Sequence, residues 1–257
     1  MAQIAASIEY EDAPPPGGLP DDMQAPSGSS LRFLSIKAID GFQVQAALWQ
    51  PEDKPPAETT IIVQMHGSGG NLASLPVRTI ARALSAKGYA ALSISTRQHD
   101  DHVNTDNFFD VRRDIEAAVV TARALGFRSI VLQGHSLGTV QVTFYAASDW
   151  DPAIAGVILT GAFGKLPWKS RHILIQEEGK YKELAEASRE ALKAGTSAEN
   201  LPIKMLDRRG RDPGDAAALP HLSRRAGERS RWYLLDIPHP AANSRSARRG
   251  RWRCVAV

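Results

Sequence analysis

The chain has 257 residues and a mass of 27.9 kDa, and 43% of the residues are hydrophobic, which suits one large α/β domain or two small domains. Its single cysteine, Cys254, excludes a disulfide framework within one chain and a metal site built from several cysteines. No run approaches the roughly 20 apolar residues of a membrane-spanning helix, and the N-terminus lacks a signal-peptide pattern. We expect a soluble, cytoplasmic protein with no membrane partner.

The net charge of +3 is unevenly distributed along the chain. Residues 207–257 contain 12 arginines, no lysine and 5 acidic residues, whereas acidic residues outnumber basic ones in residues 1–206. The arginines of the tail come without aromatic interleaving or a recognised nucleic-acid-binding motif. We therefore expect no nucleic-acid partner.

The first predicted element is a disordered arm over residues 1–30, because Pro and Gly are frequent there, as in Pro14-Pro15-Pro16-Gly17-Gly18. Residues 32–37 and 42–46 then alternate between apolar and polar side chains around the turn pair Asp40-Gly41, which predicts a β-hairpin. Residues 60–65 form a mainly β-branched apolar run, which is typical of a strand covered on both faces.

The next hundred residues alternate between helices and buried strands. Helices are predicted over 76–87, 106–125 and 137–147, and strands over 89–94, 129–133 and 154–160. Alternating units of this length imply right-handed crossovers and a mostly parallel, doubly wound sheet of the α/β class.

The sharpest motif is the G-x-S-x-G sequence Gly134-His135-Ser136-Leu137-Gly138, between a predicted strand and a predicted helix. This context is typical of a nucleophile elbow, in which the small residues permit a sharp turn and leave the serine hydroxyl free. The N–H group of Leu137, at the start of the helix, would then stabilise an oxyanion. The alternative is a serine that merely makes a tight turn.

The second motif is His66-Gly67-Ser68-Gly69-Gly70, which also follows a buried strand and precedes a helix. Loops at these strand ends face the ligand crevice of an open α/β sheet, so the N–H group of Ser68 is the predicted second oxyanion donor. A flexible loop or a phosphate-binding loop is the alternative. The nucleotide interpretation is weak, because the loop has neither the G-x-x-x-x-G-K pattern nor the G-x-G-x-x-G pattern.

Together the two motifs and the preceding hairpin make residues 31–163 resemble the α/β-hydrolase family, in its serine esterase, lipase and peptidase-like branch. The resemblance implies that Ser136 is the nucleophile and that Leu137 and residues 66–70 form the oxyanion hole. It implies hydrolysis of an ester, thioester or amide of a small molecule, without a metal or organic cofactor. A helical segment within about 164–230 resembles the family's cap insertion.

In that family an Asp or Glu and then a His follow the serine along the chain. Residues 237–257 contain no Asp or Glu and residues 240–257 contain no His, so neither partner is carried over. An order of acid and then His does exist downstream of Ser136, with Asp207, Asp212, Asp215 and Asp236 before or beside His221 and His239. His239, however, lies between two prolines, which favours a loop residue, and His221 is no better placed. The side chain of His135 would diverge from that of Ser136 around the turn, which makes it a poor base.

These gaps predict a hydrolase domain over 31–240 that lacks its last core strands, followed by an Arg-rich irregular tail over 241–257. The alternative to an active hydrolase is a catalytically impaired hydrolase-fold protein that binds a ligand or partner, or a truncated fragment. The run His99-Asp100-Asp101-His102 contains metal-ligand types, but contiguous residues cannot all turn toward one ion, so we expect no metal site.

Overall fold

The computed structural model describes residues 9–100, 102, 108–149, 151–162, 168, 170–175, 177–194 and 254–256. By their contacts these residues belong to two compact units, one of residues 1–162 with 249–257 and one of residues 163–248. The first unit contains a β-sheet and three α-helices, and the second contains a π-helical turn (Ser170–Ile175) and helix α5 (Glu178–Ala194).

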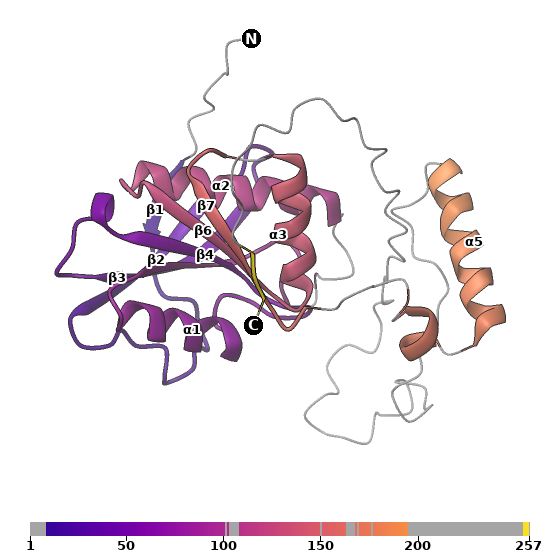
Figure 1. Cartoon of the computed structure of the whole chain (residues 1–257), viewed down its shortest axis with the longest axis horizontal. Coiled ribbons are helices and arrows are strands. Elements are labelled where there is room, and N and C mark those ends of the chain that lie inside the picture. Colours follow the sequence, from indigo (N-terminus) through magenta and orange to yellow (C-terminus); the bar gives the residue numbers. More distant parts are fainter. Residues whose placement is uncertain are drawn as a thin grey trace, which may run out of the picture. The chain divides into compact units, whose positions relative to one another are not determined.

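The first unit is built on one sheet with the strand order β1-β2-β3-β5-β4-β6-β7-β8 (Figure 1). Strands β1 to β3 are antiparallel to their neighbours, and the other five are mutually parallel. The predicted hairpin and mostly parallel α/β sheet are therefore confirmed. The strands are β1 (Tyr10–Ala13), β2 (Ser29–Lys37), β3 (Gln43–Pro51), β4 (Thr60–Met65), β5 (Ala90–Ser95), β6 (Ser129–His135), β7 (Ile154–Thr160) and β8 (Cys254–Ala256).

Helices cover both faces of the sheet. Helix α1 (Leu75–Ser85) lies on one face, and α2 (Val111–Ala124) and α3 (Leu137–Ser148) pack together on the other (Figure 1). Alternate strand residues point to opposite faces, so Trp49 joins the cluster around α1 while Leu48 joins the larger cluster with α2 and α3. Both side chains are fully buried.

The helix ends follow local signals. Pro76 stands in the first turn of α1, where its missing N–H costs no hydrogen bond. Gly88 and Gly126 follow α1 and α2 with φ of 82° and 97°, which glycine adopts without strain. Helix α2 starts at Val111 because residues 108–110 form a 3-10 turn; residues 106 and 107, where the predicted helix begins, lie outside the described residues.

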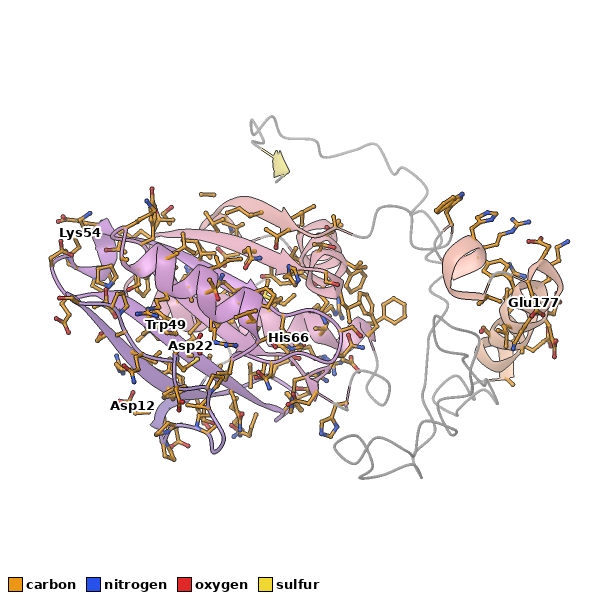
Figure 2. The ribbon with its side chains drawn as sticks, turned by 90° about the horizontal axis from the view of Figure 1, so that it is seen from below. Asp12, Asp22, Trp49, Lys54, His66 and Glu177 are labelled. Carbon is orange, nitrogen blue, oxygen red and sulfur yellow. The ribbon has the colours of Figure 1, made fainter. Side chains whose placement is uncertain are left out.

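The predicted disordered arm differs from the structure over residues 9–30. Strand β1 pairs antiparallel with β2. Met23 is buried in the same hydrophobic cluster as Trp49 and Ala81 of α1. Asp12 accepts a 2.8 Å hydrogen bond from Arg32, and Asp22 accepts one of 2.8 Å from Arg78 of α1. The two aspartates are labelled in Figure 2. The free edge of β2 offers unpaired backbone N–H and C=O groups, so an extended segment can pair with it. A segment rich in Pro and Gly can still form such a pair.

The C-terminal residues also differ from the irregular tail predicted over 241–257. Cys254–Ala256 forms β8, a parallel neighbour of β7, so one more short strand follows β7 than the sequence predicts. Three residues are too few to show a hydrophobic period. Residues 195–253 lie outside the described residues, and with them the predicted domain end at 240 and most of the predicted cap.

The second unit contributes a helix with an exposed charged surface. Helix α5 carries the pairs Lys182–Glu178 and Lys193–Glu190 at helical spacing. Trp168 is 53% exposed, and its ring lies 5.0 Å from that of His172. None of the helices described in either unit is long and apolar enough to cross a membrane.

Candidate active site

The G-x-S-x-G motif forms the turn between β6 and α3. Ser136 has φ 54° and ψ −114°, a backbone conformation that costs a residue with a side chain about 1–3 kcal/mol. The flanking glycines are required by contact distances. A Cβ on Gly134 would lie 2.2 Å from the carbonyl oxygen of Gly138, and one on Gly138 would lie 2.7 Å from the carbonyl oxygens of Met65 and His66. The turn can form because the positions two before and two after Ser136 are both glycine, the one residue that fits there.

Hydrogen bonds hold the backbone of Ser136 on both sides. Its N–H group donates to the carbonyl oxygen of Thr160 at 3.0 Å. Its carbonyl oxygen accepts the N–H of Thr139 at 3.0 Å and the hydroxyl of Thr139 at 2.6 Å. Leu137 is the first residue of α3, where N–H groups have no partner within the helix. Such a group can bind an oxyanion next to the Ser136 hydroxyl.

The glycine-rich loop after β4 lies beside Ser136. A Cβ on Gly67 would stand 3.0 Å from the Cβ of Ser136, so a side chain at 67 would crowd the serine. The N–H of Gly70 donates to the carbonyl oxygen of Gly67 at 3.0 Å, which closes a tight turn over Ser68 and Gly69. The structure thus brings the predicted oxyanion loop and the predicted elbow together.

His66 anchors this loop and is the one loop residue whose side chain is fully buried. Its Nε2 accepts the backbone N–H of Thr96 at 3.2 Å, so Nδ1 carries the proton and donates to the carbonyl oxygen of Gly67 at 2.7 Å. Burial lowers the pKa of His66 to about 4, because the charged imidazolium would be desolvated. With both nitrogens engaged, His66 positions the loop and is not available as a base.

The segment after β5 is the third element of the site, and buried polar contacts fix it. Arg97 lies between Asp114 of α2, at 2.7 Å, and Asp40 of the hairpin turn, at 2.9 Å. Burial alone would raise the pKa of Asp40, but hydrogen bonds from Arg97 and Arg113 lower it to about 2. Gln98 accepts a 3.1 Å hydrogen bond from Gln141 of α3. The segment is therefore tied to helices α2 and α3 and to the hairpin turn.

Asp100 connects this segment to the oxyanion loop. Its N–H donates to the carbonyl oxygen of Gly70 at 2.9 Å, and its Oδ1 accepts from Asn71 at 2.8 Å. Its Oδ2 lies 2.8 Å from Nδ1 of His99. In the described ranges no group of three or more His, Cys, Asp or Glu side chains could hold a metal ion. The contacts of Asp100 brace the loop.

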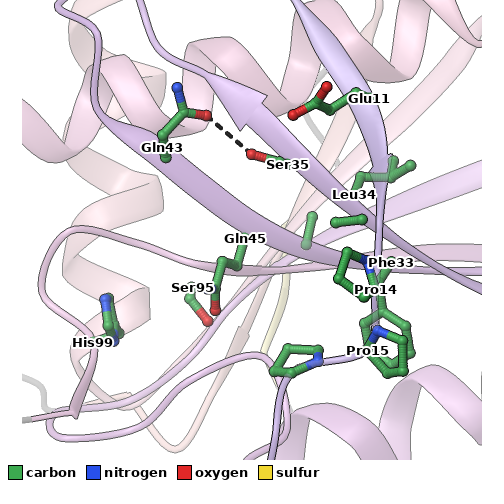
Figure 3. A pocket seen from close by; sticks show the side chains of 13 residues that line it. Glu11, Pro14, Pro15, Phe33, Leu34, Ser35, Gln43, Gln45, Ser95 and His99 are labelled. Atoms are coloured by element: carbon green, nitrogen blue, oxygen red, sulfur yellow. Dashed lines mark hydrogen bonds between the residues drawn. The ribbon is translucent and has the colours of Figure 1, made fainter.

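A cavity of about 450 Å³ has His99 among its lining residues (Figure 3). Pro14, Pro15 and Phe33 line one side of it, and Gln45 and Ser95 line the other. Neither Ser136 nor the loop of residues 66–70 is among its lining residues. Through His99 the cavity adjoins the segment that braces the oxyanion loop.

The histidines and acids considered as partners of Ser136 are only partly described. The ring of His135 lies against Gly161 and its Nδ1 is 3.3 Å from the Thr160 hydroxyl, so its side chain is directed to β7. His221 and His239 lie outside the described residues, as do the four aspartates considered with them.

Sequence reasoning missed the polar side chains that support the turn. Gln64 and Gln133 are buried in strands whose other central residues are apolar, and Thr160 ends β7. A signal was present, because each glutamine lies in an otherwise apolar run close to a glycine-containing motif. Gln64 stands two positions before His66, and Gln133 stands directly before Gly134. The glutamines were overlooked because a run of mainly apolar residues is interpreted as a buried strand, whatever its single polar residue.

The strand order and the elbow can be compared with known proteins. A family model for the alpha/beta hydrolase fold matches residues 60–242. The chain belongs to this family. No curated protein sequence matches it.

Three solved structures illustrate the structural likeness. A cold-adapted esterase from an Arctic intertidal metagenomic library is 22% identical, with TM-score 0.44 over 53% of this chain and 62% of that one. Est1E from Butyrivibrio proteoclasticus, solved with ferulic acid, is 25% identical, with TM-score 0.46 over 52% and 55%. Hypothetical protein PA2218 from Pseudomonas aeruginosa is 14% identical, with TM-score 0.51 over 69% and 60%, and shares the fold. The chain thus spans less than two thirds of each of these proteins.

Proposed function

We propose that the chain is a serine hydrolase that cleaves an ester, thioester or amide of a small molecule through an acyl-enzyme on Ser136. The observation that carries the proposal is the left-handed backbone of Ser136, at the carboxyl end of β6 and next to Gly67. Glycine would adopt this φ without strain, so a serine there is explained by a need for its hydroxyl.

The reaction would follow the usual course of acyl transfer. The Oγ of Ser136 attacks the substrate carbonyl carbon while its proton passes to a general base. The N–H groups of Leu137 and Ser68 bind the oxyanion of the tetrahedral intermediate. The alcohol, thiol or amine leaves with a proton, and water then hydrolyses the acyl-enzyme. His221 and His239 stay candidates for the general base.

A second candidate function is the binding of an acyl ligand or a partner without cleavage. It is favoured by the two imidazoles beside the site, because His66 is held neutral with both nitrogens engaged and His135 is directed to Thr160. In that case the loop and the elbow would form a carbonyl-binding site only.

Hydrolysis of p-nitrophenyl acetate and butyrate tests the proposal. We expect turnover by the wild type and a loss of roughly 10³-fold or more in kcat/KM for Ser136→Ala. Ser148→Ala, at the far end of the same helix, removes an exposed hydroxyl that bonds to the carbonyl oxygen of Phe144, and should leave turnover unchanged. Equal turnover by wild type and Ser136→Ala would contradict the proposal, and a folded but inactive wild type would favour the binding function.

A further inference from the structure

A chain of buried side chains crosses the parallel sheet from β5 to β7. Ser93 contacts Gln64 at 2.9 Å, and Gln64 contacts Gln133 at 2.9 Å. Gln133 contacts the hydroxyl of Thr160 at 2.8 Å, and that hydroxyl contacts the carbonyl oxygen of Gly134 at 3.1 Å. The first three side chains are at most 1% exposed. A continuous polar path therefore runs through an apolar core and ends at the elbow.

The direction of every hydrogen bond follows from the last acceptor. A carbonyl oxygen can only accept, so the Thr160 hydroxyl donates its one proton to Gly134, and its own oxygen accepts from the Gln133 amide nitrogen. The remaining contact of this hydroxyl, with Nδ1 of His135 at 3.3 Å, is longer than both. The amide oxygen of Gln133 then accepts from Gln64, and the amide oxygen of Gln64 accepts from Ser93. All four donors thus point toward the elbow, an arrangement in which successive bonds polarise one another.

Thr160 holds the elbow at two points on either side of His135. Its hydroxyl binds the carbonyl oxygen of Gly134, and its carbonyl oxygen binds the N–H of Ser136 at 3.0 Å. A strained conformation such as that of Ser136 persists only where its surroundings fix it from several sides. The hydroxyl of Thr160 has its own position fixed by Gln133, which is fixed in turn by Gln64.

We propose that Thr160 is a positioning residue for Ser136, and that Gln64 and Gln133 form a buried relay that sets the Thr160 hydroxyl. The proposal rests on the nucleophilic role of Ser136 stated above. The relay keeps the elbow in its reactive geometry before substrate binds, so its loss slows attack by Ser136 even in a fully folded protein. If these side chains only filled the core, removing the Thr160 hydroxyl would not change the rate of attack by Ser136.

The test compares Thr160→Val, which keeps the shape and removes the hydroxyl, with Thr160→Ser, which keeps the hydroxyl. Thr60→Val is the matched control: it removes a 3.3 Å contact between hydroxyl groups at the other end of the same sheet. The first measurement is the rate of labelling by a fluorophosphonate probe, at a temperature where circular dichroism shows each variant to be folded. The second is hydrogen exchange of the peptide containing residues 134–138.

We expect Thr160→Val to label about tenfold to a hundredfold more slowly than the wild type, because a small displacement of a reacting group has that cost. Thr160→Ser should stay within about threefold of the wild type, and Thr60→Val should match it. Exchange of residues 134–138 should be faster only in Thr160→Val. Labelling of Thr160→Val at the wild-type rate would overturn the positioning role and leave the proposed function standing.

A wild type that does not label would contradict the proposed function, and hydrogen exchange then decides the relay by itself. Faster exchange at 134–138 in Thr160→Val, but not in Thr160→Ser or Thr60→Val, would support the relay. Equal exchange in Thr160→Val and the wild type would overturn it.

Discussion

The two ends of the parallel strands treat left-handed backbone differently. At the amino ends, the turns into β5 and β6 use Gly88 and Gly126 for the positive φ. At the carboxyl ends, Gly69 and Gly161 also have positive φ, but so do Asp100 and Ser136, with φ of 48° and 54°. Among the described residues these two are the non-glycine residues with positive φ. Strained backbone at a non-glycine residue therefore occurs where the side chain makes contacts, as at Asp100, or has a proposed chemical role, as at Ser136.

Polar contacts that join separate elements show a related difference. The carboxyl ends hold His66, Arg97 and Gln98, each nearly inaccessible to solvent. His66 is hydrogen-bonded to the segment after the neighbouring strand, Arg97 to α2 and Gln98 to α3. At the amino ends, Arg123 and Asp151 form an ion pair whose arginine is 55% exposed. A buried polar contact is costly to break, whereas an exposed ion pair contributes little. The site end should consequently be the more sensitive to substitution.

The largest effect is expected from adding one methyl group to the elbow. Gly134→Ala places a Cβ 2.2 Å from the carbonyl oxygen of Gly138, and we expect it to lower the free energy of unfolding by about 3 kcal/mol. Gly17→Ala is the control, because that glycine has an ordinary φ and no neighbour within 4 Å, and it should change stability by less than about 0.5 kcal/mol. Equal values from urea denaturation would contradict the packing argument.

The next effect is a pH dependence that originates at His66. Its pKa is about 4 in the folded protein, below the usual value of 6.5, so the unfolded chain binds the proton more tightly between these values. Stability is therefore full above about pH 6.5 and falls as the pH decreases toward 4, by about 3 kcal/mol in total. Urea denaturation across this range should show a steeper loss for the wild type than for His66→Gln. Equal slopes would show that His66 is not held neutral.

Asp40 should act in a separate and more acidic window. Its folded pKa of about 2 lies below the usual 3.8, so its contribution is present above pH 3.8 and is lost as the pH falls toward 2. Asp40→Asn should therefore reduce the loss of stability below pH 4 and leave the slope between pH 4 and 6.5 unchanged. A changed slope in the higher window would contradict this assignment and would point to Asp114, because the charge of Asp40 helps to raise the pKa of that buried carboxyl.

The smallest expected effect compares the strain at the two ends directly. Ser136→Gly should be more stable than Ser136→Ala by about 1 kcal/mol, because glycine adopts the φ of 54° without strain. Gly126→Ala at the amino end should lose about 1 kcal/mol, since its φ is 97° and its new Cβ would meet Pro56 at an ordinary 3.5 Å. Thermal or urea denaturation of the four proteins would measure both differences, and opposite signs would refute the strain account.

Much of the first unit could be predicted from the sequence. The apolar runs at 60–65 and 129–133 and the three helical patterns fixed the order of elements, because strand and helix periods are local properties. The G-x-S-x-G motif located the turn for a similar reason, since its glycines are demanded by contacts within a few residues.

The support of the site could not be predicted in this way. The partners of Thr160 are 26 and 27 residues away in the chain, and the partner of His66 is 30 residues away. Such pairs depend on strand register, which hydrophobic periodicity does not supply across parallel strands. The short strands β1 and β8 were missed because a few residues paired at an edge need no distinctive composition.

The central claim is that Ser136 is a nucleophile, and covalent labelling tests it most directly. The folded wild type is incubated with a fluorophosphonate, and the modified peptide is identified by mass spectrometry, with Ser136→Ala and heat-denatured wild type as controls. The account predicts one adduct, on Ser136, that is lost in both controls because it needs the hydroxyl and the folded oxyanion site. A folded wild type without an adduct on Ser136 would contradict it.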